Sequence, residues 1–199
     1  KHVVAHNKDI YSKLTASDHK DITLLYHCFD SDLWSPGPTP PHSNFRVGFA
    51  GHKQSLKGLE IIKSAVALLP GTVLIAPTYE SGRIPHNEMP NFYRSLDAYV
   101  CMSAAGQDAG PRPPIEAGLC GCPVITTAAG QIGEMIDNNV NGLVVERTTE
   151  SLVDALCKLK SNTELRNYLS SAIRKSFLDK WVIKVGIDWT SYLSRIATE

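Results

Sequence analysis

Residues 97–127 read DAYVCMSAAGQDAGPRPPIEAGLCGCPVITT, and they carry the clearest indication of the fold class. It opens with a short apolar run, DAYVCMS, which predicts a buried strand. The next residues, AAGQDAGPRP, are predicted to form a loop, because their glycines and prolines interrupt regular structure. A short apolar helix, PIEAGLCG, and a second strand, PVITT, complete the unit. This order is typical of a parallel sheet covered by helices.

The same alternation extends in both directions along the chain. Residues 45–51 (FRVGFAG) and 72–77 (TVLIAP) predict strands. The helix predicted between them has an apolar face made of Leu59, Ile62, Val66 and Leu69. After a last predicted strand, LVVE, everything beyond Arg147 has a helical pattern, with a threonine cap at its start. We therefore predict an α/β fold with a Rossmann-like, doubly wound parallel sheet.

The first 34 residues repeat the strand–helix–strand pattern on a smaller scale. Residues 35–44, SPGPTPPHSN, then contain four prolines, each of which removes an amide donor and restricts the backbone. We predict a linker there, a Rossmann-like domain over 45–178 and a C-terminal helix over 179–199.

The composition excludes several classes of protein. The 199 residues include 20 Lys and Arg against 20 Asp and Glu, so the chain is formally neutral, and we expect no nucleic-acid partner. No apolar run is long enough for a transmembrane segment, and the N-terminus lacks the pattern of a signal peptide. The five cysteines lack the paired spacing of a zinc site, and we interpret them as small buried residues in a reducing, cytoplasmic environment. The chain also lacks an initiator methionine, as a fragment would.

Sheets of this kind bind ligands in the loops at the carboxyl ends of their strands, here 51–58, 77–90 and 103–114. The first loop begins at Gly51, which lets a ligand approach the backbone, and its Lys53, Lys57 and His52 could neutralise a diphosphate. On spacing alone, the preferred interpretation is that these lysines are ordinary solvated charges at the start of a helix.

The third loop carries the more informative pattern. Asp108 and Gly110 precede a helix in which Glu116 lies one turn from the start, among apolar residues. A buried carboxylate there needs hydrogen-bond donors, which two ribose hydroxyls would supply. Gly110 and the free amides at the helix start could meet a phosphate. The alternative is that Asp108 caps a turn and Glu116 faces solvent.

This block resembles the donor site of retaining GT-B glycosyltransferases of family 4, the glycosyltransferase group 1 type. The family pattern is Glu-x7-Glu-Ala-x-x-x-Gly-x-Pro-Val-Ile, followed by a glycine-rich turn, a Glu and Asn-Gly-Leu-Val. The residues in register are Glu116, Ala117, Gly121, Pro123, Val124, Ile125, Gly130, Glu134, Asn141, Gly142 and Leu143. Residues 48–58 (GFAGHKQSLKG) resemble the family's phosphate loop, and residues 22–36 (ITLLYHCFDSDLWSP) its linker segment, so the resemblance spans nearly the whole chain.

The resemblance implies roles for several residues. Glu116 would hold the ribose hydroxyls, Asp108 would contact the donor sugar, and Lys57 would pair with the diphosphate, helped by amides near Gly51, Gly110 and Pro111. These roles make Asp108, Glu116 and Lys57 the candidate catalytic residues.

Three departures from the family pattern bear on these roles. Asp108 and His52 stand where the family usually has Glu and Arg, so Lys53 would compensate for His52. Arg112 is an unusual loop cation that is either a second phosphate contact or a solvent-facing charge. A β–α unit that contacts the base in the family is reduced here to residues 77–88 (PTYESGRIPHNE), which leaves base contacts to Pro77, Thr78, Tyr79 or Ile84.

Other side chains that could carry chemistry are assigned to structure. His27, His42 and His86 have no carboxylate or cysteine at ligand or triad spacing, and we interpret them as structural or surface residues. Trp181 and Trp189 are eight residues apart, which suits a packing face of a helix better than a sugar platform.

As a whole, the resemblance implies the donor-binding half of a glycosyltransferase. It implies retaining, metal-independent transfer from a nucleotide-diphospho-sugar of UDP or GDP type, without a further cofactor. Residues 1–34 would be the tail of a preceding acceptor domain, which would bind a sugar, lipid-linked or protein acceptor. The chain alone would then be inactive, and the full enzyme would be cytoplasmic, or peripheral at a membrane if its acceptor is lipid-linked.

Two alternatives stay open at this point. A UDP-sugar 2-epimerase of the same fold would need further catalytic carboxylates and histidines. A non-catalytic interaction domain with a degenerate donor site would fail to bind nucleotides at micromolar concentration.

Overall fold

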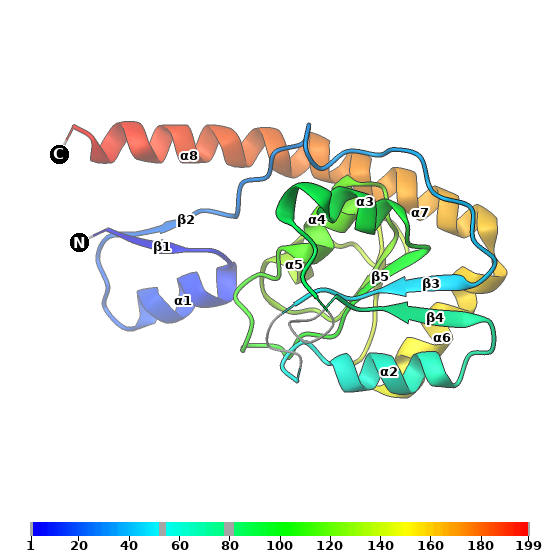
Figure 1. The fold of residues 1–199 in the computed structure, drawn as a ribbon. Coiled ribbons are helices and arrows are strands. Elements are labelled where there is room, and N and C mark those ends of the chain that lie inside the picture. The colour runs from blue at the N-terminus through cyan, green and yellow to red at the C-terminus, as the bar shows by residue number, and fades with distance from the viewer. Residues whose placement is uncertain (1, 52–54, 78–81, 199) are drawn as a thin grey trace.

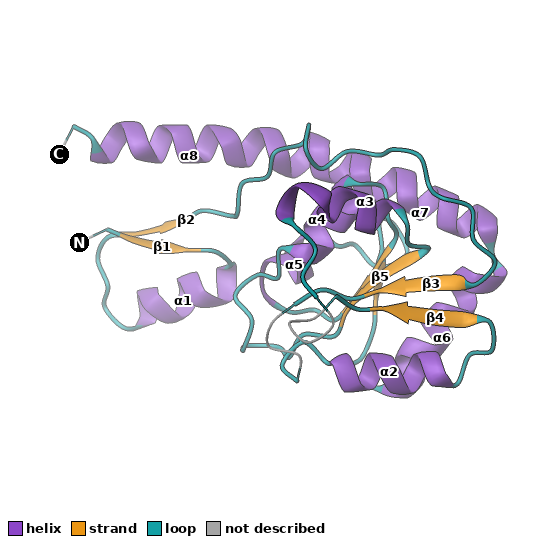
Figure 2. Ribbon diagram, viewed as in Figure 1, coloured by secondary structure: helices purple, strands orange, loops and turns teal. Residues whose placement is uncertain are grey.

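The computed structural model of the chain describes residues 2–51, 55–77 and 82–198. A small parallel pair, β1 (Val3–Ala5) and β2 (Ile22–Leu24), is joined by the helix α1 (Lys8–Ala16). The main sheet has five strands in the order β4-β3-β5-β6-β7, and all its pairings are parallel. Its strands are β3 (Phe45–Gly48), β4 (Thr72–Ile75), β5 (Ala98–Cys101), β6 (Val124–Thr126) and β7 (Leu143–Val144). The predicted α/β doubly wound fold is confirmed (Figures 1 and 2).

Helices alternate with these strands and continue after the last of them. Between the strands lie α2 (Leu59–Ala67), the 3-10 turn η1 (His86–Glu88), α3 (Met89–Arg94), α4 (Pro113–Leu119) and α5 (Gly130–Met135). After the sheet come α6 (Thr149–Ser161), α7 (Thr163–Ser176), the π-helical segment η2 (Phe177–Val182) and α8 (Ile183–Ile196). Side-chain caps fix two of these helix starts: Thr148 accepts from the Ser151 amide, and Asn162 accepts from the Leu165 amide.

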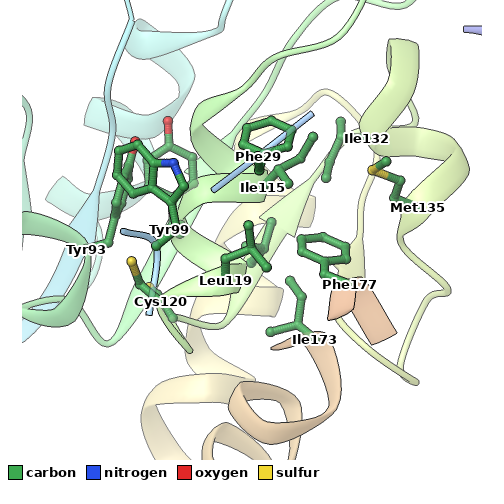
Figure 3. Packing of buried hydrophobic residues seen from close by; sticks show 14 of the residues in the cluster. Phe29, Tyr93, Tyr99, Ile115, Leu119, Cys120, Ile132, Met135, Ile173 and Phe177 are labelled. Atoms are coloured by element: carbon green, nitrogen blue, oxygen red, sulfur yellow. The ribbon is translucent and has the colours of Figure 1, made fainter. Parts of the chain in front are cut away.

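The central strand β5 divides the core into two layers because its side chains alternate between the faces of the sheet. Val100 belongs to the cluster under α2 and α6, together with Ile62 and Leu156. Tyr99 belongs to the opposite cluster, which α3, α4 and the C-terminal helices cover. Figure 3 shows this second cluster, in which Ile115 and Leu119 of α4 pack toward Ile173 and Phe177.

The predicted face of α2 is shifted by one position from the observed one. Leu59, Ile62 and Ala65 are buried, whereas Val66 and Leu69 are partly buried and pack at the edge of the same cluster. Ala65 is fully buried in this cluster, and a spacing drawn through the large apolar residues did not include it.

The last helix does not begin at residue 179 as predicted. Residues 163–196 form one uninterrupted helical run, and Phe177–Val182 has π geometry within it. No glycine or proline interrupts residues 163–185, so nothing in the sequence stops the helix there. Figure 1 shows the end of this run extending over β1 and β2.

The two tryptophans of this helical run pack against the segment that follows β2. The Trp181 ring lies 5.0 Å from the Tyr26 ring, and the Trp189 Nε1 donates to the Tyr26 carbonyl oxygen at 2.8 Å. The predicted packing role of both tryptophans is confirmed. Through them the C-terminal helix holds the N-terminal β1-α1-β2 unit beside the main sheet.

Candidate functional site

The strand order places a topological switch point at the carboxyl ends of β3 and β5, and we call the space between the loops that follow these two strands the crevice. The chain leaves β3 toward β4 on one side and then returns to β5 on the other. The loops after β3 and β5 diverge at this switch point, and open α/β sheets bind their ligands in the gap. The loops that carry Lys57 and Asp108 therefore border one crevice, as the sequence predicts.

Backbone contacts hold the first loop against the end of β5. The Met102 amide donates to the Lys57 carbonyl oxygen at 3.2 Å, and the Ala104 amide donates to the Leu56 carbonyl oxygen at 3.1 Å. Gly58, with φ of +72°, ends this loop, and a Cβ there would lie 2.5 Å from Met102 Cβ. Only glycine permits that turn at that distance, and the turn directs Lys57 into the crevice.

The Lys57 ammonium and the Asp108 carboxylate form an ion pair in the crevice. The distance from Lys57 Nζ to Asp108 Oδ2 is 3.1 Å, and the side chains are only 17% and 13% exposed. The same oxygen accepts from Ser103 Oγ at 2.9 Å, and Oδ1 accepts from the Gly110 amide at 3.3 Å. Asp108 thus caps the turn, as one sequence reading proposed, and also holds the charge of Lys57 in the site.

Glu116 is buried one turn into α4, which rules out the solvent-facing alternative. Only 7% of the residue is exposed, and its Oε2 accepts from the Tyr93 hydroxyl at 2.8 Å. Burial raises the pKa of this carboxyl above its usual value of 4.5, while the Tyr93 hydrogen bond and the nearby Arg112 and His86 lower it. Oε1 lies 3.7 Å from Arg112 and accepts no hydrogen bond within the described part of the chain. Glu116 Oε1 can therefore accept further hydrogen bonds.

The start of α5 is in close contact with the loop that carries Asp108. Gly130 has φ of +55°, and a Cβ there would lie 2.3 Å from the Asp108 carbonyl oxygen and 2.7 Å from Ala109 C. The Gln131 amide donates to the Ala109 carbonyl oxygen at 3.1 Å. Only a residue without a side chain fits at position 130. The close contact there fixes the position of the loop that carries Asp108 and Gly110.

Two histidines from the N-terminal unit stack beside this loop. The rings of His6 and His27 lie 4.3 Å apart, with 21° between their planes. His27 Nδ1 is 2.7 Å from Gln131 Oε1, which also accepts from the His27 amide at 3.1 Å. Burial lowers the pKa of His27, the Gln131 hydrogen bond raises it, and the charges of His6 and Arg112 lower it further. A neutral imidazole that donates from Nδ1 therefore borders the site.

Sequence reasoning missed His27, His86 and Tyr93 as neighbours of the site. The two histidines lack a partner at motif spacing, and Tyr93 was indistinguishable from a core residue of a short amphipathic helix. The one usable signal for His27 was its place in the segment that resembles the family's linker.

The N-terminal unit is tied to the same loops by polar contacts. Asn7 Nδ2 donates to the Ala109 carbonyl oxygen at 2.5 Å, while its Oδ1 caps α1 through the Ile10 amide. Glu134 of α5 accepts from the Tyr26 hydroxyl at 2.6 Å and from the Lys8 amide at 2.7 Å. Glu134, one of the residues in register with the family pattern, thus connects α5 of the main domain to the N-terminal unit.

The remaining predicted site residues divide into two groups. Gly51 borders the Lys57 side chain, Pro111 is buried, and the Arg112 guanidinium lies 5.8 Å from the centre of the Phe29 ring. The Arg112 side chain is 54% exposed, and its guanidinium lies 3.7 Å from Glu116 Oε1; its role as a phosphate contact stays a prediction. The other group, His52, Lys53, Thr78 and Tyr79, lies outside the described residues.

Two searches of the described residues add to this picture. They contain no group of three or more His, Cys, Asp or Glu side chains that could hold a metal ion. Among the helices of the described ranges, none is long and apolar enough to cross a membrane.

Comparison with known proteins identifies relatives of this chain. The family model described as "Glycosyl transferases group 1" matches residues 74–176, just over half of the chain. The Bacillus subtilis (strain 168) protein named "Putative glycosyltransferase YtcC" is 32% identical over 94 residues, which are 46% of this chain and 23% of that protein.

Solved structures share the fold at lower identity. Sucrose-phosphate synthase of Thermosynechococcus elongatus aligns with a TM-score of 0.85 and 18% identity, over 99% of this chain and 59% of that one. Anabaena HepE, solved in complex with UDP-glucose, aligns with a TM-score of 0.83 and 18% identity, over 98% of this chain and 64% of that one. This chain therefore spans less than two thirds of the length of these proteins.

Proposed function

The chain belongs to the group 1 glycosyltransferases, and from this we propose that it is the half of such an enzyme that binds a nucleotide-diphospho-sugar donor. The proposal assigns the crevice at the carboxyl ends of β3 and β5 to that donor.

The observation that carries the proposal is the unfilled acceptor capacity of Glu116. A buried carboxylate is costly unless donors surround it, and here one neutral hydroxyl, from Tyr93, is its only hydrogen-bond donor in the described residues. Two vicinal hydroxyls of a ribose would complete the site through Oε1. Glu116 would thereby orient the nucleoside.

Lys57 supports a diphosphate at the other end of the crevice. Its ammonium is largely buried and paired with Asp108, so its position is fixed before a ligand binds. A diphosphate would draw Lys57 partly away from Asp108 and leave the Asp108 carboxylate free to accept hydroxyl groups of the donor sugar. Amides near Gly51, Gly110 and Pro111 would add further donors.

We propose retaining transfer without a metal ion. The bond from the anomeric carbon to the β-phosphate oxygen breaks, a bond to an acceptor hydroxyl forms on the same face, and the hydroxyl proton passes to the departing diphosphate. Lys57 stabilises the negative charge that develops on the diphosphate. UDP-sugars are the first donors to test, because HepE was solved with UDP-glucose, and GDP-sugars are the second.

The chain would act together with an acceptor-binding domain, of which residues 1–34 would form the last part. We expect the 199 residues alone to bind the donor and to transfer no sugar. Activity is therefore not the readout to use for this chain.

Calorimetric titration with UDP, GDP and their sugars tests the donor site directly. Glu116→Ala should weaken binding by about 10–100-fold, because it removes hydrogen bonds to a charged acceptor. Glu164→Ala, at an exposed position of α7, is the matched control and should bind like the wild type. Equal binding by the wild type and Glu116→Ala would overturn the assignment, and absence of nucleotide binding would favour a non-catalytic interaction domain.

A further inference from the structure

Arg147 links two loops at the carboxyl edge of the main sheet. It lies in the short segment between β7 and α6, and β6 separates β7 from β5. Its Nε donates to the Met102 carbonyl oxygen at 2.9 Å, and its Nη2 donates to the Ser55 carbonyl oxygen at 3.0 Å. Met102 directly follows β5, and Ser55 belongs to the loop after β3. One side chain thus bridges the two loops that border the crevice.

The two hydrogen bonds of Arg147 lie at the two ends of the turn that carries Lys57. The Ser55 carbonyl oxygen also accepts from the Gly58 amide at 3.2 Å, which closes a turn over residues 55–58. At the other end, a Cβ on Gly58 would lie 2.8 Å from the Met102 carbonyl oxygen. Arg147 therefore holds the carbonyl group that begins this turn and the carbonyl group against which the turn ends.

The shape of an arginine side chain suits this bridge. Its guanidinium is planar, and the hydrogens on Nε and Nη2 point in nearly the same direction along one edge of the group. It can therefore hold two carbonyl oxygens from different segments at a fixed spacing. A lysine at the same position would keep the charge, but its single flexible ammonium group would not impose that spacing.

The position of the Lys57 ammonium depends on this turn. The Lys57 backbone lies within residues 55–58, and its Nζ is 3.1 Å from Asp108 Oδ2 in the crevice. If Ser55 were released from Met102, the turn could move, and Nζ would have to be ordered again when a diphosphate binds. A binding group that is already held in place avoids that entropic cost, so the bridge should strengthen binding.

We propose that Arg147 is a positioning residue of the donor site, which acts on the diphosphate through Lys57. This inference rests on the proposed donor function and adds to it a residue that follows β7, at the edge of the sheet.

The test compares Arg147→Lys with the wild type by calorimetric titration of UDP and of uridine. The residue is exposed, so the variant is expected to fold. Because the substitution keeps the charge and removes the bridge, it should weaken UDP binding by about three- to tenfold and leave uridine binding unchanged. In a Lys57→Met background, the same substitution should have no further effect on UDP binding, since its action passes through Lys57.

Arg166→Lys is the matched control. Arg166 of α7 also donates to two backbone carbonyl groups, those of Leu159 and Lys160. These contacts lie at the opposite edge of the sheet, where Lys160 donates to Thr72 at the start of β4. Arg166→Lys should lower the urea midpoint and leave UDP binding unchanged, which separates a general loss of stability from an effect on the donor site.

Each outcome bears on the inference. If Arg147→Lys binds UDP like the wild type, the bridge does not position Lys57 and the inference is wrong. If the substitution weakens UDP binding equally with and without Lys57, or weakens uridine binding to the same extent, Arg147 does not act through Lys57 and the inference is again wrong. In both cases the donor function stands, because the wild type binds UDP. If the wild type does not bind UDP, the proposed function fails, and this inference fails with it.

Discussion

Gly130→Ala should damage both the stability of the protein and its donor site. The residue has φ of +55°, and an added Cβ would lie 2.3 Å from the Asp108 carbonyl oxygen. The neighbour is backbone, so a rotamer change cannot relieve the contact. Either α5 or the loop that carries Asp108 has to move.

The size of the effect follows from these two costs. Left-handed backbone costs an alanine about 1–2 kcal/mol and overpacking about 1–3 kcal/mol, so the free energy of unfolding should fall by about 2–5 kcal/mol. With an m-value of about 2 kcal/mol per molar urea, the midpoint should fall by roughly 1–2.5 M. The displaced Asp108 and Gly110 should also weaken nucleotide binding by about tenfold.

Urea unfolding and calorimetry measure both effects, and the chain offers a matched control. Gly186 lies inside α8, and an added Cβ there meets nothing within 4 Å. Gly186→Ala should therefore raise the free energy of unfolding by about 0.5–1 kcal/mol and leave nucleotide binding unchanged. If Gly130→Ala matches the wild type in urea midpoint and in nucleotide affinity, the close approach of α5 to the Asp108 loop is wrong.

Three further predictions concern the crevice. Tyr93→Phe removes the hydroxyl donor of the buried Glu116, so the free energy of unfolding at neutral pH should fall by about 1–3 kcal/mol, measured in urea; no change would show that Glu116 is otherwise solvated. Burial raises the pKa of Glu116 above 4.5 in the folded chain, so the folded state keeps the Glu116 proton to a higher pH than the unfolded state does. The contribution of Glu116 to the free energy of unfolding should therefore fall as pH rises from 4.5 through the raised pKa. Glu116→Gln should flatten that part of the pH–stability curve, and an unchanged curve would contradict the assigned cause. Lys57→Met should weaken UDP binding by about tenfold or more and leave uridine binding unchanged by calorimetry, because only the diphosphate needs the charge; equal losses for both ligands would indicate a structural role for Lys57.

Part of the site was predictable from the sequence because its residues are close along the chain. The loop 103–112 contains Asp108 and Gly110, and Glu116 follows one helical turn after the loop ends. An apolar strand before that loop and an apolar helix after it suffice to predict that it opens at the edge of a parallel sheet. The apolar residues around Glu116 in the same helix made its burial one of two interpretations of the sequence, and only the structure excluded the solvent-facing one.

The pairings across the chain were not predictable in the same way. Lys57 and Asp108 are 51 residues apart, and Tyr93 and Glu116 are 23 apart, so no local period relates them. Their contact depends on β5 lying between β3 and β6, and on the turn at Gly58. The stacked His6 and His27 come from a separate β-α-β unit, which no spacing rule connects to the loop of Asp108.

Local sequence patterns were enough to predict the order of strands and helices, the parallel sheet, and the block from Asp108 to Glu134 that resembles the family, because periodicity, glycines and prolines act over a few residues. The folded chain was needed to show which side chains share the crevice, and that Asp108 holds Lys57 while Glu116 keeps one oxygen free. It also showed that Arg147 bridges the loops after β3 and β5. These features depend on strand order and on contacts between distant segments, where small differences in packing select one arrangement among many that the same local patterns allow.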